Sequence, residues 1–406
     1  MLRIGITGDA FIRWGGGLDF LRTVVSSLHA TAVPMELHFL APGQGPRAAL
    51  QRVDRKLRTV AKAVLGKKTA HSYEPTRVDL HRAIDSFGVP IKTHDIDIGM
   101  TALARQARHL SLNVLLPSFS PLPFGKELPW LGYLYDFQHR HLPEFFTEKE
   151  CAQRDRQFEA MLVRASVVIV NAKAVETDIA TFYPGSRASV FALPFSTAPS
   201  ASWLAADGAP VRQKYGVPPR YLILCNQFWL HKDHATAFTA FADLARHSDF
   251  ADVDLVCTGA TSDHRSVGYI EALMQQLREN GLESRVHILG LIPKNDQIAL
   301  LNGAIALLQP TLSEGGPGGG AVYDAVALGV HSIVSDIPVN LEIADEELVS
   351  FFHARDPSSL TLAMRARLAA PTPRPTSAQL IDQGSVRRAR CGNVLLSAID
   401  CARRGQ

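Results

Sequence analysis

The sequence contains no run of about 18 consecutive apolar residues, the length that a membrane-spanning helix requires. Its first residues, MLRIGITG, look like the start of a strand and not like a secretory signal. Cysteines are few and far apart, with no CxxC spacing: Cys151, Cys225, Cys257, Cys391 and Cys401. We therefore predict reduced cysteines in a cytoplasmic protein that neither spans a membrane nor is exported by a signal peptide.

An excess of charge of one sign is also missing. The chain has 42 Lys and Arg against 39 Asp and Glu, a formal net charge of +3. So small a net charge creates no global field for nucleic acid, which we do not expect as a partner. With 46% hydrophobic and 20% charged residues, the composition is that of a folded globular protein and not of a disordered one.

A length of 406 residues exceeds what one hydrophobic core usually supports, so we expect two domains. Short β-branched runs alternate with amphipathic stretches, which predicts an α/β fold of two Rossmann-like parallel sheets. We place the first domain at 1–198, the second at 199–384, and a C-terminal helix at 385–406 that returns to the first domain. The Pro, Ala and Ser stretch from Pro194 to Pro210 predicts an exposed linker between the domains.

Strands and helices are expected at regular intervals. First-half strands lie near 3–8, 35–40, 113–116, 130–135, 167–171 and 189–193, and helices near 18–29, 76–87, 148–164 and 175–183. Second-half strands are YLILCNQ, VDLVCTG, VHILG, AIALLQP and HSIVSD, and a helix is expected near 357–368. The segment from Ala370 to Ser377 breaks this regularity before the final helix.

The strongest local signal is the segment TLSEGGPGGGAVYDAVALGVHSIVSD, from Thr311 to Asp336. A strand leads into a loop with five glycines and then into a helix, so backbone N–H groups at a helix N-terminus can hold a diphosphate without a metal. Glycine lets the ligand approach the backbone closely. Glu314 would accept hydrogen bonds from sugar hydroxyls, and Asp324 would hold a ribose diol. The alternative is a mobile glycine loop with two solvated acids. The glycines are Gly315, Gly316, Gly318, Gly319 and Gly320.

This segment resembles the Glu-x7-Glu signature of the retaining GT-B glycosyltransferases of bacterial family 4, including O-antigen and capsule polysaccharide transferases. Glu314 matches the first acid, DAVALG at Asp324 the second, and SIVSD the following strand. The second acid is Asp here, and it stands two residues further from the first than in the family pattern. The resemblance implies two domains facing each other across a cleft, with the donor held mainly by the second domain.

A second signal is NQFWLHKDH, from Asn226 to His234, between a strand and a helix. It resembles the family segment that supplies an Arg and a Lys to the donor diphosphate. Lys232 falls at the Lys position, where its charge would offset that of the leaving group, and Gln227 falls at the Arg position. A surface role for Lys232 and zinc binding by His231 and His234 are the alternatives.

Two first-half segments complete the predicted site. WGGGLDFLR, from Trp14 to Arg22, resembles the family's Gly-Gly loop, so Gly16 and Gly17 are predicted to contact the donor, although any tight strand-to-helix turn uses glycine. In GYLYDFQHRHLPEFF, from Gly132 to Phe146, we expect Asp136, His139 and His141 to face the cleft. Asp136 and His139 are the catalytic candidates among them, with a structural role as the alternative for each histidine.

The segment from Pro46 to Lys68 predicts a basic amphipathic helix. Such a helix suits either an anionic membrane surface, where polyprenyl-linked acceptors reside, or packing on its own domain. Asp95 and Asp97 form an Asp-x-Asp pattern that we attribute to chance, because the resemblance implies no metal and no cofactor beyond the donor.

The resemblance implies a retaining, metal-independent hexosyltransferase that uses a nucleotide diphosphate sugar and a glycan or lipid-linked acceptor in surface polysaccharide synthesis. A mannosyl or rhamnosyl donor is expected. The alternatives are a sugar-nucleotide epimerase or phosphorylase of the same fold, and a non-catalytic protein that binds nucleotide sugars.

Overall fold

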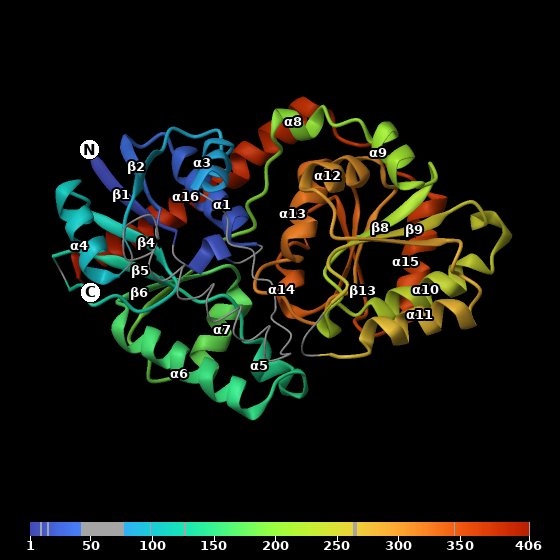
Figure 1. The fold of residues 1–406 in the computed structure, drawn as a ribbon, viewed down its shortest axis with the longest axis horizontal. Coiled ribbons are helices and arrows are strands. Elements are labelled where there is room, and N and C mark those ends of the chain that lie inside the picture. The colour runs from blue at the N-terminus through green and yellow to red at the C-terminus, as the bar shows by residue number, and fades with distance from the viewer. Residues whose placement is uncertain are drawn as a thin grey trace, which may run out of the picture.

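The computed structural model describes residues 1–8, 10–13, 16–41, 77–97, 99–125, 127–262, 266–344 and 346–405. The predicted basic helix at 46–68, and Trp14 and Gly15 of the first glycine segment, lie outside the described residues. The described chain forms two lobes that lie side by side, each built around a parallel sheet (Figure 1).

The first sheet has seven strands in the order β3-β2-β1-β4-β5-β6-β7, and all of its neighbouring pairs are parallel. Strands β4, β5 and β6 are buried along their whole length, as parallel strands covered on both faces must be. The strands are β1 (Leu2–Thr7), β2 (Met35–Ala41), β3 (Lys92–Asp95), β4 (Val114–Ser118), β5 (Trp130–Tyr133), β6 (Val167–Val170) and β7 (Ser189–Ala192).

The second sheet has six parallel strands in the order β10-β9-β8-β11-β12-β13. Both strand orders reverse direction in the middle, between β1 and β4 and between β8 and β11, as in doubly wound folds. The strands are β8 (Tyr221–Cys225), β9 (Asp254–Thr258), β10 (Val286–Gly290), β11 (Leu307–Gln309), β12 (Ser332–Ser335) and β13 (Val349–Phe352).

Helices cover both faces of each sheet, so each lobe has three layers with an apolar core on either side of its sheet. The helices of the first lobe are α1 (Gly17–His29), α3 (Arg77–Asp85), α4 (Met100–His109), α5 (Gln138–His141), α6 (Glu148–Arg164) and α7 (Lys173–Phe182). Those of the second are α9 (Gly208–Tyr215), α10 (His234–Ala245), α11 (Tyr269–Glu279), α12 (Lys294–Gly303), α13 (Gly319–Ala327), α14 (Pro338–Leu341) and α15 (Pro357–Ala369).

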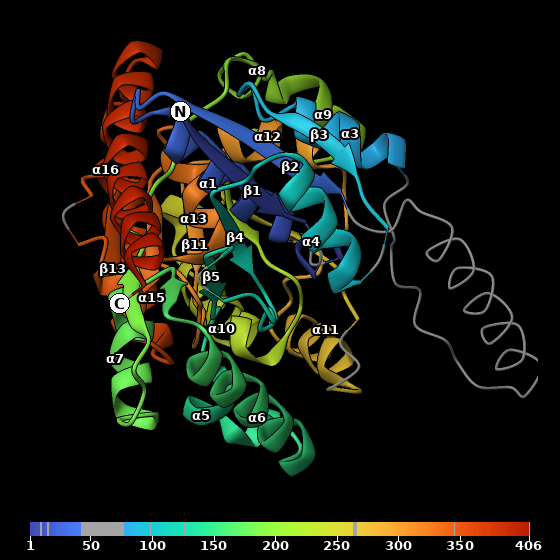
Figure 2. The same ribbon diagram turned by 90° about the vertical axis from the view of Figure 1, so that its left-hand side faces the viewer.

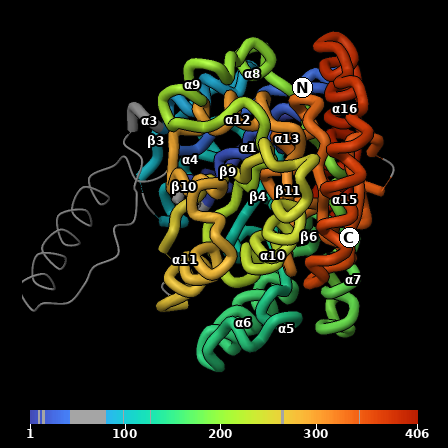
Figure 3. The backbone as a smooth tube through the Cα atoms, turned by 90° about the vertical axis from the view of Figure 1, so that its right-hand side faces the viewer, coloured from blue at the N-terminus to red at the C-terminus, as the bar shows by residue number. Residues whose placement is uncertain are grey.

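The last helix, α16 (Ser377–Arg404), packs on the first lobe and runs along one side of the molecule (Figures 2 and 3). It begins with a capping box of Thr376 and Gln379. A Cβ atom added at Gly392 would lie 2.1 Å from the carbonyl oxygen of Ser27, so only glycine allows α16 to lie this close to α1. The predicted fold class of two Rossmann-like units with a returning helix is therefore confirmed.

The segment between the sheets differs from the predicted exposed linker. Phe195, Ser196, Thr197 and Trp203 are buried, and a short helix, α8 (Ala201–Leu204), lies at the junction of the lobes (Figure 1). Phe195 and Trp203 join an apolar core of the second lobe. The prediction failed because isolated aromatic residues between prolines and serines produce no periodic pattern.

Several elements were absent from the sequence-based prediction, namely β3, α4, α5, α8, α9 and β13. The final helix also starts at Ser377 rather than near Ser385. Among the described residues, no helix is both long and apolar enough to cross a membrane.

Candidate active site

Polar side chains meet at the carboxyl ends of β8 and β11, the point where the second sheet reverses its strand order. Asn226 follows β8 and donates a hydrogen bond of 2.8 Å from Nδ2 to Oε1 of Gln309, the last residue of β11. Both side chains are buried. Gln309 in turn donates from Nε2 to Oε1 of Glu314 at 3.1 Å. Ligands of open α/β sheets bind at this position, so the amides orient Glu314 where a ligand is expected.

Lys232 and Glu314, the two catalytic candidates of the second half, form an ion pair. Lys232 ends the short 3-10 helix Leu230–Lys232 after β8, and Glu314 lies in the loop after β11. Their side chains are 12% and 11% exposed. The site thus holds one cation and one carboxylate at the switch point, where the cation can offset phosphate charge and the carboxylate can accept hydrogen bonds from hydroxyl groups.

The glycine loop wraps around Glu314. Gly318 and Gly319 have φ values of 69° and 63°, in the left-handed region that favours glycine. A Cβ at Gly319 would lie 2.8 Å from the carboxyl carbon of Glu314. The Gly318 amide donates to Oδ1 of Asn340 at 2.7 Å and the Gly319 amide to the Gly316 carbonyl at 3.0 Å. These two N–H groups shape the loop, which leaves the amides of Gly315, Gly316 and Gly320 as the candidates for anion binding.

The first lobe approaches the glycine loop directly. A Cβ at Gly315 would lie 2.2 Å from the carbonyl oxygen of Tyr135, and one at Gly316 would lie 3.0 Å from Cβ of Asn171. Asp136 therefore lies beside the donor loop, as a site between the two domains requires. Its Oδ1 atom accepts hydrogen bonds from Nη1 of Arg154 at 3.1 Å and from the Gln138 amide at 3.0 Å.

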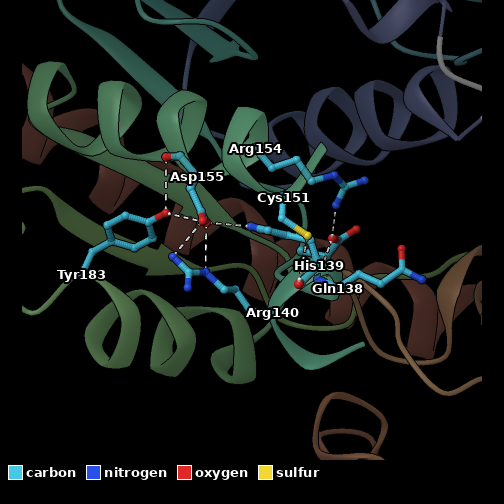
Figure 4. Close-up of polar contacts among 8 residues, drawn as sticks. Gln138, His139, Arg140, Cys151, Arg154, Asp155 and Tyr183 are labelled. Carbon is cyan, nitrogen blue, oxygen red and sulfur yellow. Dashed lines mark hydrogen bonds and ion pairs between the residues drawn. The ribbon is translucent and has the colours of Figure 1, made fainter. Parts of the chain in front are cut away.

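His139 does not face an open cleft, and that expectation is wrong. Its side chain is 0% exposed, and Nε2 lies 2.9 Å from Oδ1 of Asp155 (Figure 4). The same carboxylate accepts hydrogen bonds from Nε of Arg140 at 2.9 Å and from the Tyr183 hydroxyl at 3.3 Å. Burial lowers the pKa of His139. This position fits the structural alternative and gives no support to a catalytic role.

His141 is half exposed and lies 2.9 Å from the carboxylate of Asp178. The hydrogen bond to Asp178 raises the pKa of His141. This histidine therefore also has a partner on α7, within its own lobe.

Asp324, the candidate ribose ligand, lies within α13 and pairs with Lys294 at the start of α12. Burial raises the pKa of the Asp324 carboxyl. Nζ of Lys294 lies 5.8 Å from the ring centre of Trp203, and the guanidinium of Arg22, from the first lobe, lies 4.9 Å from it. The ribose role of Asp324 stays a prediction, and a bound ribose would have to share its carboxylate with Lys294.

The remaining residues predicted to bind the donor differ in how far they are buried. Gln227 is half-buried in the loop that leads from β8 to Lys232. Gly17 is buried, and a Cβ there would lie 2.1 Å from the carbonyl oxygen of Phe11, so packing alone explains this glycine. Gly16 is exposed at the N-terminus of α1.

The structure does not support zinc binding by His231 and His234. In the part of the chain that the structure describes, no three His, Cys, Asp or Glu side chains are grouped as metal ligands. The buried His234 ring stacks on Phe228 at 4.0 Å, and burial together with the charge of Lys232 lowers its pKa to about 3.

Three residues that orient the site were missed from the sequence: Gln309, Asn340 and Lys294. Gln309 had a detectable signal, because a polar residue closes the otherwise apolar strand ALLQ. Asn340 lies in the short helix α14 and Lys294 begins α12, and no local sequence pattern links either residue to the glycine segment.

Comparison with known proteins relates the second lobe to a known family. Residues 219–369, which lie in the second lobe, match the family described as Glycosyl transferases group 1. No curated protein matches the chain in sequence.

Solved structures match both lobes. Sucrose-phosphate synthase from Thermosynechococcus elongatus is 16% identical with a TM-score of 0.57, covering 100% of this chain and 98% of that one. The Anabaena protein HepE in complex with UDP and glucose is 14% identical with a TM-score of 0.55 and the same coverage. WaaG, a glycosyltransferase involved in lipopolysaccharide biosynthesis, is 14% identical with a TM-score of 0.52, covering 98% of each chain.

At these identities the structural likeness establishes the fold, and the predicted GT-B arrangement is confirmed. The family match of residues 219–369 separately supports glycosyl transfer as the activity.

Proposed function

We propose that the protein is a retaining glycosyltransferase that moves a hexose from a nucleotide diphosphate sugar to a glycan or lipid-linked acceptor. The observation that carries this proposal is the Lys232–Glu314 pair, enclosed by the glycine loop and opposed by Tyr135 and Asp136 of the other lobe. A cation, free loop amides and a carboxylate at one switch point match the diphosphate and hydroxyl groups of such a donor.

Donor binding would exchange the internal contacts of this pair. Lys232 and the loop amides would bind the diphosphate. The Glu314 carboxylate would instead accept hydrogen bonds from the hydroxyls of the transferred sugar. Gln227, where the family pattern has Arg, would contribute a neutral donor. The similar HepE structure was solved in complex with UDP, which supports a nucleotide ligand for this fold.

The proposed chemistry is a front-face substitution with retention. The bond between the anomeric carbon and the phosphate oxygen breaks as the acceptor oxygen bonds to the same face of the sugar. The acceptor proton passes to the departing phosphate oxygen, whose growing charge Lys232 and the loop amides stabilise. These groups need no divalent metal, so we propose metal-independent transfer.

We further propose an acceptor of bacterial surface polysaccharide synthesis, with mannose or rhamnose as the transferred sugar. The involvement of the similar protein WaaG in lipopolysaccharide biosynthesis agrees with this class. Contact of residues 46–68 with the inner face of the plasma membrane rests on their sequence alone. Vesicle sedimentation tests it, and a lack of binding to anionic vesicles at low salt would exclude the contact.

The test of the proposed function is release of nucleoside diphosphate from GDP-mannose, dTDP-rhamnose and UDP-glucose, with and without extracted lipid-linked glycans, in EDTA. We expect acceptor-dependent release from at least one donor and a glycan product of increased mass. Conversion of the donor without an acceptor would favour an epimerase, and binding without turnover would favour a non-catalytic protein.

A further inference from the structure

Gln138 carries a buried amide without a hydrogen-bond partner. It is the first residue of α5, it is only 6% exposed, and among the described residues nothing accepts a hydrogen bond from its Nε2 atom. Leaving a buried polar group unpaired costs about 1–3 kcal/mol. Such groups are rare in native proteins, and an absent ligand is one physical explanation.

The backbone of α5 is fixed without help from this amide. Asp155 of α6 holds His139 and Arg140, each at 2.9 Å, and Arg154 holds Asp136 at 3.1 Å. In Figure 4 the Gln138 side chain points away from the Asp155 network and toward the ribbon of the second lobe. These contacts hold the neighbours of Gln138, so its amide extends from a fixed backbone, as a preorganised binding group requires.

The amide also lies next to the donor loop. The Gln138 N–H donates to Asp136, and Asp136 Cβ would lie 3.6 Å from a Cβ at Gly315. Gln138 is therefore only two residues along the chain from Asp136, which lies beside the loop that surrounds Glu314. Its free donor belongs to the first lobe, whereas the carboxylate proposed to hold the transferred sugar belongs to the second.

We infer that Nε2 of Gln138 donates a hydrogen bond to a sugar hydroxyl oxygen held between the lobes. The inference rests on the proposed function and adds a first-lobe residue to its site. The hydroxyl belongs either to the transferred sugar or to the acceptor. In both cases a neutral amide suits the position, because it donates to oxygen without a charge that would pair with Asp136.

The test compares Gln138→Leu and Gln138→Met with the control Gln153→Leu, which changes an exposed glutamine on α6. Because the amide has no partner in the free protein, both variants should keep the unfolding midpoint of the wild type or raise it. We expect kcat/KM for transfer to fall about tenfold in both, the size of one lost hydrogen bond, and to stay unchanged in the control.

Binding measurements separate the two sources of the hydroxyl. If it belongs to the donor, the Kd of the nucleotide sugar rises about tenfold while that of the nucleoside diphosphate alone is unchanged. If the hydroxyl belongs to the acceptor, the Kd values of the nucleotide sugar and the nucleoside diphosphate both stay at the wild-type value, and the KM of the acceptor rises. Transfer within twofold of the wild type, or a lowered midpoint in both variants, would overturn the inference. A wild type that binds no nucleotide sugar would refute the proposed function and the inference with it.

Discussion

At the residue scale, the Lys232–Glu314 pair compensates two charges that would otherwise lie almost fully buried and unpaired at the switch point. A bound donor must replace this pair with contacts of similar strength. The two residues therefore hold each other in position when no substrate is bound, and their relative placement is preset for a ligand with both anionic and hydroxyl groups.

Glu314→Ala should abolish detectable transfer, because the carboxylate proposed to hold the sugar is lost. The fold should persist, since Glu314 lies in a loop outside the apolar cores. Transfer rates and circular dichroism measure the two effects, with Glu283→Ala at an exposed position as control. Turnover at the wild-type rate in Glu314→Ala would refute its assignment.

His234 predicts how stability depends on pH. Its pKa is lowered to about 3 in the folded state, whereas an unfolded histidine has its ordinary value of 6.5. Below pH 6.5 the unfolded chain therefore binds a proton that the folded chain excludes. The free energy of unfolding should fall as the pH drops from 6.5 toward 3, by on the order of a few kcal/mol.

His234→Phe retains a ring to stack on Phe228 and removes the titrating group, so it should flatten this acid dependence. Urea unfolding at pH 7 and pH 5 measures it, with His247→Phe at an exposed site as control. An equally steep loss in His234→Phe would assign the acid sensitivity to other groups.

The sequence assigned Glu314 and Lys232 to one donor site, and the structure pairs them, because both follow strands that end at the same edge of the sheet. The sequence-based prediction for His139 was wrong because the local sequence around a histidine near a strand end is the same whether its ring faces a ligand or Asp155. The partner that decides this lies 16 residues away on another helix, where no local pattern reveals it.

At the element scale, the glycine loop has separate physical reasons for its glycines. Gly318 and Gly319 need the left-handed backbone, whereas Gly315 and Gly316 leave room for the first lobe. A Cβ at Gly320 would meet nothing within 4 Å. The sequence predicted the loop and its position but could not assign these reasons, since each depends on what packs against the backbone.

This difference makes a matched test. Gly319→Ala places a methyl group against the Glu314 carboxyl and strains the backbone, so it should lower the affinity for nucleotide sugars by at least about tenfold. Gly320→Ala keeps the backbone amide and adds a methyl group that meets no protein atom within 4 Å, so it should lower that affinity clearly less than Gly319→Ala does. Calorimetric titration measures both, and equal affinities in the two variants would show that the loop does not shape the donor site.

Short elements escaped prediction for a similar reason. The strand KTHD of β3 is polar and only four residues long, and its pairing with β2 at the sheet edge comes from the backbone. Long elements with continuous apolar patterns, such as β1 and α1, were located within a few residues because their own side chains form the core.

At the scale of the whole molecule, the lobes are joined by contacts besides the chain connections. The Glu342 carboxylate accepts hydrogen bonds from the Lys173 amide at 2.9 Å and the Ala174 amide at 2.7 Å, at the N-terminus of α7 in the opposite lobe. A negative charge there is favoured by the helix dipole. No sequence motif joins these residues, so this contact could not be predicted.

Glu342→Ala should therefore loosen the association of the lobes while each lobe stays folded. We expect a larger radius of gyration in small-angle X-ray scattering without ligand, and an unchanged circular dichroism spectrum. Glu347→Ala, an exposed acid nearby in sequence, is the control. Identical scattering of Glu342→Ala and wild type would show that this contact does not hold the lobes together.

The central claim is that the second lobe binds a nucleotide diphosphate sugar through Lys232 and the glycine loop. Thermal unfolding with a panel of nucleotide sugars tests it most directly, because a ligand at 100 times its Kd adds about 2.7 kcal/mol to the stability of the folded state. We predict a raised midpoint with at least one nucleotide sugar in EDTA, and little or no rise for Lys232→Ala at the same concentration. No shift with any nucleotide sugar or nucleoside diphosphate, or an equal shift in Lys232→Ala, would contradict the account.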